Sequence, residues 1–188
     1  MRAPGFALHL VTAALVLAVA APAPAELRIN DLDVFLNDFE VTVHVVLLGA
    51  IPPSFTEGLE SGIPALLRFT VELWQYNRLW PDRLLTTRVV ERQLTYNVVS
   101  KEFKVTSVKG ETRSPYASRE MRDAQRVLSE LRGMKLSPAT SLDPAGVIYV
   151  RVNAESALAG ENTFLARFNG TAEQTSRQSN YRTLLRVQ

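Results

Sequence analysis

The sequence predicts an α+β fold, a mostly antiparallel β-sheet with one long α-helix packed against it. Several segments alternate between apolar and polar residues, as strands with one buried face do. Short connections join consecutive segments of this kind, and only antiparallel neighbours can be joined so closely. A later segment carries an apolar stripe at helical spacing, which predicts the helix that packs on the sheet.

The alternation is clearest in two segments of the first half of the chain. In residues 39–47 the odd positions are apolar, while Glu40, Thr42 and His44 lie between them. Residues 63–75 repeat the pattern, and a single helical turn ended by Gly62 is predicted before them. The same reasoning predicts further strands over residues 84–99, 103–108 and 147–154.

The long helix is predicted from a stripe of apolar residues that recurs every third or fourth position. Ser114–Pro115 or Ser118 suits its start, and Gly133 suits its end. Because Leu128 lies in the middle of the stripe, we expect its side chain to be buried against the sheet. The full stripe consists of Ala117, Met121, Ala124, Leu128 and Leu131.

Residues 1–25 have the features of a signal peptide. Arg2 gives the positive start, an apolar run follows over residues 6–21, and Ala23 and Ala25 are the small residues required before the cleavage site. The alternative is an uncleaved membrane anchor, but a spanning helix needs about 20 apolar residues and this run is shorter. We therefore expect cleavage after Ala25 and a mature protein that is periplasmic or secreted.

The remaining chain has the length of one ordinary domain. Residues 26–154 are interpreted as the sheet-rich domain, because they contain all the well-defined strand and helix patterns. Residues 155–188 are interpreted as a C-terminal extension, either partly disordered or an added hairpin. Asn169–Gly170 suits a hairpin turn, and the alternation from Tyr181 onward suggests a terminal strand.

Composition excludes several classes of function. The chain has no Cys, so disulfide frameworks, thiol nucleophiles and thiolate zinc sites cannot form. After cleavage His44 is the one remaining histidine, which leaves the common nucleophile–base pairs incomplete. The charge is nearly balanced, with 21 Lys and Arg against 19 Asp and Glu, so nucleic-acid binding has little support. No catalytic residue, metal or cofactor is expected.

Carboxylates cluster near the start of the predicted domain. They could in principle support acid–base chemistry, as paired carboxylates do in glycoside hydrolysis. Acidic side chains at turns and strand ends are more often solvated, and this cluster lacks the glycine and terminal glutamate of a calcium loop. The cluster consists of Asp31, Asp33, Asp38 and Glu40.

A group of aromatic and basic residues is the best candidate for a binding site. Trp74 and Tyr76 share the strand face opposite the apolar set, and Trp80 follows closely. Aromatic side chains with neighbouring arginines are typical energetic anchors of protein interfaces. Arg78 and Arg83 are close in sequence and could form a charged rim. The alternative is that the helix covers these aromatics as part of the core.

The region around Gly62 resembles that of a known family. The resemblance covers roughly residues 27–154 and is most specific in the first of three pieces, which are Leu59–Glu60–Ser61–Gly62–Ile63–Pro64, Asp82–Arg83 and Leu94–Thr95–Tyr96. The family is an uncharacterised bacterial family of exported proteins, catalogued as a domain of unknown function. Its members are often encoded beside a nitrogen-regulation-type sensor histidine kinase. The resemblance implies a role in the cell envelope and brings no catalytic residues.

These observations together favour a non-enzymatic periplasmic interaction protein. Its expected partner is another envelope protein, with the ectodomain of a sensor kinase as one possibility. The alternative is a carrier of an apolar or lipid-like ligand held between sheet and helix. A carboxylate-based hydrolase is a less favoured third hypothesis. No nucleic acid is expected as a partner, and contact with the membrane is expected only through the signal peptide before its cleavage.

Overall fold

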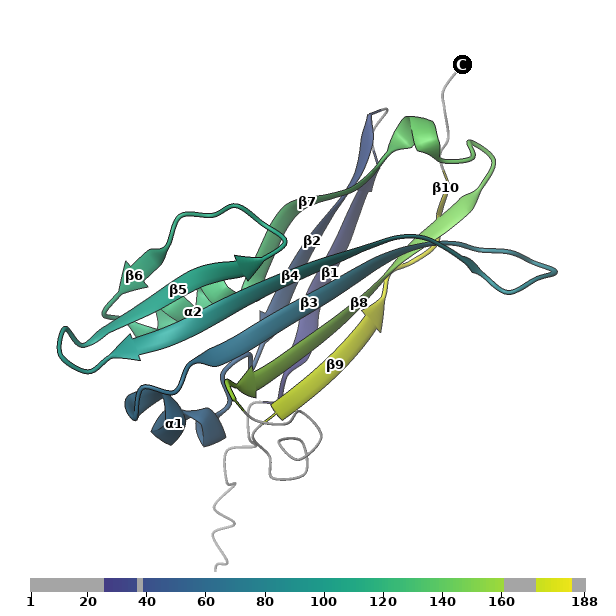
Figure 1. Ribbon diagram of the computed structural model, residues 1–188. Helices are drawn as coiled ribbons and strands as arrows, with labels where there is room; N and C mark the ends of the chain where they lie inside the picture. The colour runs from purple at the N-terminus through teal and green to yellow at the C-terminus, as the bar shows by residue number, and fades with distance from the viewer. Residues whose placement is uncertain (1–25, 37–38, 161–171, 184–188) are drawn as a thin grey trace, which may run out of the picture.

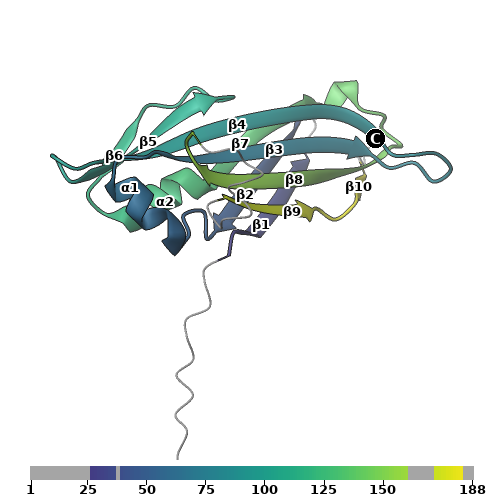
Figure 2. The same ribbon diagram turned by 60° about the horizontal axis from the view of Figure 1, so that its bottom comes forward.

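The computed structural model describes residues 26–36, 39–160 and 172–183, which form two antiparallel sheets (Figure 1). The smaller sheet has the order β1-β2-β7 and lies across one face of the larger sheet (Figure 2). The larger sheet has the order β10-β8-β3-β4-β5-β6, and β9 also pairs with β8. The predicted antiparallel sheet is therefore confirmed, whereas the second sheet was not predicted.

The strands of the smaller sheet are β1 (Arg28–Leu36), β2 (Glu40–Leu48) and β7 (Glu130–Pro138). Those of the larger sheet are β3 (Ala65–Gln75), β4 (Arg83–Asn97), β5 (Glu102–Lys109), β6 (Tyr116–Ser118), β8 (Val147–Leu158), β9 (Ala172–Gln178) and β10 (Arg182–Thr183). The helices are α1 (Thr56–Glu60) and α2 (Met121–Ser129), and the short 3₁₀ turns are η1 (Pro53–Phe55) and η2 (Ala139–Ser141).

One apolar core lies between the two sheets. The alternation predicted for β2 is confirmed, because Val41, Val43 and Val45 are all fully buried. The same holds for β3, where Leu67 and Phe69 face the core and the intervening residues face outward. This burial of one face from each sheet is the main source of stability in such an arrangement.

The prediction of one long helix is wrong. α2 spans only the nine residues Met121–Ser129, because the chain is extended on both sides of it. Ala117 lies in strand β6, and Leu131 lies in β7 with its side chain buried in the core. Gly133 does not end the helix; it lies in β7 with a φ of +63°. The expected burial of Leu128 is confirmed, since that side chain is fully buried.

The C-terminal part of the described chain continues the larger sheet. The boundary placed at Glu155 falls within β8, which runs on to Leu158. β9 pairs with β8 along its whole length, and β10 pairs with the start of β8. The predicted signal peptide and the Asn169–Gly170 turn lie outside the described residues. In the described part of the chain, neither helix has the length and apolar character needed to cross a membrane.

Gly62 joins α1 to β3 in the left-handed conformation, with a φ of +85°. Its N–H donates to the carbonyl of Leu59, and the Ile63 N–H donates to that of Gly58, the two bonds of a Schellman motif. A Cβ at this position would meet no atom within 4 Å, so a substitution would introduce backbone strain without a clash. The prediction that Gly62 ends a helical turn before β3 is confirmed.

Replacing Gly62 with valine should therefore destabilise the fold by about 1 kcal/mol, because a β-branched residue fits the left-handed region poorly. Gly62→Asn is the matched control and should lose much less, since asparagine tolerates this conformation. Urea unfolding of the three proteins measures the difference. Equal stability of Gly62→Val and the unchanged protein would contradict the strain argument.

Candidate functional site

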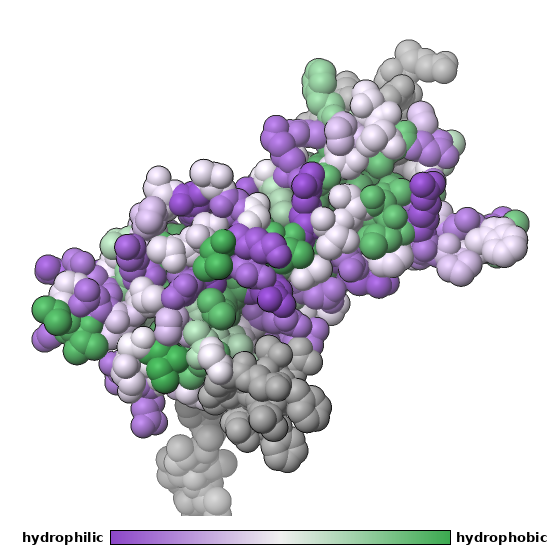
Figure 3. Space-filling view, in the orientation of Figure 1, coloured by the Kyte–Doolittle hydropathy of each residue, from purple (hydrophilic) through white to green (hydrophobic). Residues whose placement is uncertain are grey.

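The predicted binding residues lie on the hairpin formed by β3 and β4. Its loop, residues 76–82, projects from the body of the molecule (Figures 1 and 3). Trp74 is near the end of β3, Arg78 and Trp80 are in the loop, and Arg83 begins β4. The structure thus places all five predicted residues on one hairpin. Trp74 is half-buried, whereas the other four side chains are exposed.

Trp74 belongs to an aromatic cluster on the outer face of the larger sheet. Its ring stacks on Tyr149 of β8, with centroids 6.4 Å apart and planes 6° apart. The guanidinium of Arg151 lies 5.1 Å from the centre of the Trp74 ring, and the indole N–H donates to Glu72 at 2.9 Å. Trp74 is therefore half-buried and serves the packing of this face.

Tyr76 connects this cluster to the loop. Its ring lies edge-on to Tyr181 at 5.2 Å, and Tyr181 lies edge-on to Tyr149 at 5.4 Å. Tyr149 and Tyr181 were missed from the sequence, because each is far along the chain from Trp74. The alternation that begins at Tyr181 was the one sequence signal for a strand here. The strand that it pairs with could not be deduced from the sequence.

Side-chain hydrogen bonds fix the conformation of the loop. The Asn77 N–H donates to Asp82 at 3.0 Å, and the Asn77 side-chain oxygen accepts from the N–H groups of Leu79 and Trp80 at 3.1 and 3.3 Å. The Tyr149 hydroxyl donates to the other oxygen of Asp82 at 2.8 Å, which ties the loop to β8. Leu79 and Trp80 are consequently held outward, with 85% and 75% of their surfaces exposed.

These bonds also change the acidity of both partners. The hydrogen bond from the Asn77 N–H, followed by that from Tyr149, lowers the pKa of the Asp82 carboxyl. Burial, followed by the bond to Asp82, raises the pKa of Tyr149 to about 12. At neutral pH the Asp82 carboxylate is therefore ionised and accepts the hydrogen bond, and the Tyr149 hydroxyl is protonated and donates it.

Folding stability should fall as the pH rises from about 10 to about 12. In that range the unfolded chain releases the Tyr149 proton, whereas the folded protein retains it until the pKa near 12 is reached. Tyr149→Phe should remove this part of the alkaline loss, although it also removes the bond to Asp82. Urea unfolding midpoints measured across the range test this, with Tyr96→Phe as the control that should keep the loss. An identical pH profile for Tyr149→Phe and the unchanged protein would refute it.

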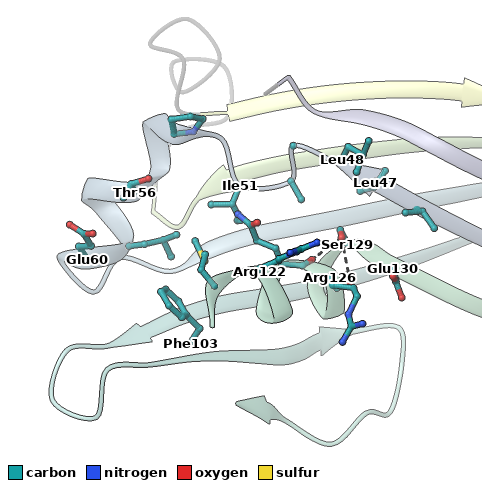
Figure 4. Close-up of a pocket in the computed structure, with 17 residues that line it drawn as sticks. Leu47, Leu48, Ile51, Thr56, Glu60, Phe103, Arg122, Arg126, Ser129 and Glu130 are labelled. Carbon is teal, nitrogen blue, oxygen red and sulfur yellow. Dashed lines mark hydrogen bonds between the residues drawn. The ribbon is translucent and has the colours of Figure 1, made fainter. Parts of the chain in front are cut away.

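A second feature is a pocket of about 680 Å³ at the other end of the larger sheet. Figure 4 shows its walls, formed by the end of β2 and the segment leading to α1 on one side and by α2 on the other. Leu47, Ile51 and Leu59 supply apolar wall, and Phe103 of β5 lies at one side. The sequence did not reveal this pocket, since its walls come from separate segments that the two-sheet fold brings together.

The other residues considered from the sequence do not form a site in the described part of the chain. His44 lies on β2 with its ring 4.7 Å from that of Phe35. Of the carboxylate cluster, Asp31 and Asp33 are exposed on β1, Glu40 pairs with Lys135 at 3.0 Å, and Asp38 lies outside the described residues. Within the described ranges, no three His, Asp or Glu side chains lie close enough to hold a metal ion.

Fold and site together define a two-sheet antiparallel β protein with a projecting aromatic hairpin at one end and an apolar pocket at the other. The chain belongs to the family described as a domain of unknown function, DUF4390, whose model matches residues 25–159. The matched residues include strands β1 to β8, and hence both the hairpin and the pocket. No curated protein and no solved structure is significantly similar to the chain.

Proposed function

We propose that this protein is a non-enzymatic binding protein of the bacterial cell envelope, which docks on an envelope protein through the β3–β4 hairpin loop. The observation that carries the proposal is the exposure of Leu79 and Trp80 at the projecting loop, 85% and 75% respectively. Large apolar side chains held outward by hydrogen bonds are costly in water unless a partner covers them.

The loop has the properties of an interface anchor. Tryptophan provides a large contact area with few rotatable bonds and is enriched among the residues that dominate binding energies. Asn77 and Asp82 hold the loop in one conformation before binding, so less conformational entropy is lost on association. Arg78 and Arg83 are exposed beside it and suit a rim that contacts acidic groups of the partner.

The partner class follows from the expected export and from the family resemblance. A protein made with the signal peptide of residues 1–25 meets its partners outside the cytoplasm. Members of the family that the sequence resembles are often encoded beside a nitrogen-regulation-type sensor kinase, which favours the ectodomain of such a kinase as the partner. This association by gene neighbourhood supports the choice of partner but supplies no mechanism.

Trp80→Ala should weaken binding to the partner by about thirtyfold, the ~2 kcal/mol expected of a central interface residue, while leaving the fold intact. A photo-crosslinking residue at position 79 of the exported protein would identify the partner. Titration calorimetry with the purified partner would then measure the affinity.

Val99→Ala is the matched control, since Val99 is 94% exposed in the turn at the opposite end of β4. We expect it to bind as the unchanged protein does. A folded Trp80→Ala protein with unaltered affinity for the crosslinked partner would disprove the hairpin interface. Trp74→Ala is less informative, because Trp74 also packs against Tyr149.

A further inference from the structure

The pocket between the end of β2, α1 and α2 opens directly on the apolar core. Leu47, Ile51 and Leu59 line it and are themselves 2%, 7% and 1% exposed, so they also belong to the core. Met121 of α2 and Phe103 of β5 extend the apolar lining. The volume of about 680 Å³ falls within the roughly 300–1,000 Å³ of small-molecule sites.

Two of the polar side chains that line the pocket are engaged by other groups of the protein. The Ser129 hydroxyl donates to the carbonyl of Gln125 at 2.7 Å, and Glu130 pairs with Arg132 at 2.6 Å. The apolar wall of Leu47, Ile51 and Leu59 offers no side-chain partner to the backbone N–H and C=O groups of a peptide, and leaving such groups unpaired is costly. An apolar chain without hydrogen-bonding groups suits the lining better.

Two arginines mark the rim on the α2 side. Arg122 and Arg126 are one helical turn apart, both exposed, and both line the pocket. The Arg126 side chain reaches Asp123 only at 3.7 Å, and the Arg122 side chain has neither an ion pair nor a hydrogen bond among the residues that the structure describes. Like charges at this spacing repel each other on a helix, and an anion between them would relieve the repulsion.

The acidic lining residues do not cancel this positive rim. Glu130 is already paired with Arg132, and Glu60 lies on α1 at the far end of the pocket (Figure 4). The pocket is therefore polarised, with two cations on the side of α2 and apolar wall behind them.

We propose that this pocket binds a single-chain amphiphile with an anionic head group. The acyl chain would lie along the apolar wall formed by Leu47, Ile51 and Leu59, and the head group would pair with Arg122 and Arg126. The proposal goes beyond the hairpin interface and does not depend on it. The pocket is lined in part by α1 (Thr56–Glu60), which lies at the opposite end of the larger sheet from the hairpin loop (Figures 1 and 2).

Binding of palmitate, measured by native mass spectrometry and titration calorimetry, tests the proposal. We expect one palmitate per chain, and much weaker binding of cetyltrimethylammonium, which has a similar chain and a cationic head. The double substitution Arg122→Gln and Arg126→Gln should weaken palmitate binding about 10- to 100-fold, the loss expected for charge-assisted hydrogen bonds. Gln125→Trp, which adds a bulky ring to the pocket wall, should abolish it.

Two controls separate binding in the pocket from a general effect of positive charge near α2 and from the hairpin interface. Arg119→Gln removes a cation next to α2 that does not line the pocket and should leave the affinity unchanged. Trp80→Ala should also bind palmitate normally, so a failure of the hairpin interface would not affect this result. Absence of palmitate binding, equal affinity for the cationic amphiphile, or full binding by a folded Gln125→Trp protein would each overturn the proposal.

Discussion

Replacing Arg92 with methionine is expected to destabilise the protein by about 3–5 kcal/mol, the usual cost of leaving one partner of a buried ion pair alone. Arg92 lies in β4 and points into the space between the sheets, where only 2% of it is exposed. Its guanidinium meets both oxygens of Glu111, at 2.5 and 2.9 Å. Methionine keeps much of the apolar stem but none of these bonds.

The same guanidinium closes the C-terminal end of α2. One nitrogen, Nη1, donates to the carbonyls of Val127, Leu128 and Glu130 at 3.0, 3.0 and 2.7 Å. Carbonyls at this end of a helix lack partners within the helix and carry partial negative charge, so a cation is doubly suited to them. Arg92→Met would leave three of them without this donor, in addition to the unpaired Glu111.

Urea unfolding monitored by far-ultraviolet circular dichroism measures the loss. Arg68→Met is the matched control, because Arg68 makes a similar contact with Glu91 at 2.9 Å on the exposed face of the neighbouring strand. Its loss should stay below about 1 kcal/mol, since water screens that pair. Comparable losses for the two substitutions would show that burial does not strengthen the Arg92 network.

Arg92 also explains why the long helix could not be predicted correctly. The stripe from Ala117 to Leu131 fits a helix throughout, and local spacing contains no signal for its early end. The end is set by a residue of β4, which binds the carbonyls around Leu128 from across the fold. Beyond that point the chain continues as strand β7, and the side chain of Leu131 is buried in the core from this strand.

The strands were predictable where one face is buried and the other is exposed to solvent. Val41 to Val45 and Leu67 to Leu73 alternate in sequence because the core requires it, and their burial follows that pattern. β7 was missed, since its bulged stretch around Gly133 interrupts the alternation. The division into two sheets was missed because pairing of β2 with β7 joins segments that are distant along the chain.

The candidate sites, too, could be predicted only where they do not depend on contacts between distant segments of the chain. Trp80 was recognised because its residue type and neighbouring arginines are informative without any contact. The binding of Asp82 by Tyr149, which fixes the loop, depends on the register of β3 with β8. The pocket depends on the approach of α2 to the end of β2, which no local pattern of residues indicates.

Leu128→Ala is expected to cost about 2–5 kcal/mol of folding stability, whereas Arg126→Ala should change it by no more than about 0.5 kcal/mol. The two residues lie two positions apart on α2, one facing the core and the other facing solvent. Leu128 is fully buried in the core, so its truncation loses apolar burial and leaves a cavity. The Arg126 side chain is 63% exposed and reaches only Asp123, at 3.7 Å.

The Leu128 substitution should also be coupled to the Arg92 network, because the Leu128 carbonyl is one of the Arg92 acceptors. A shift of α2 toward the new cavity would lengthen that bond. The double variant with Arg92→Met should therefore lose less stability than the sum of the two single losses, by at least about 0.5 kcal/mol. Denaturant unfolding of the four proteins measures this coupling. Similar losses for Leu128→Ala and Arg126→Ala would mean that α2 presents a different face to the core, and strict additivity would mean that its anchoring by Arg92 is independent of its packing.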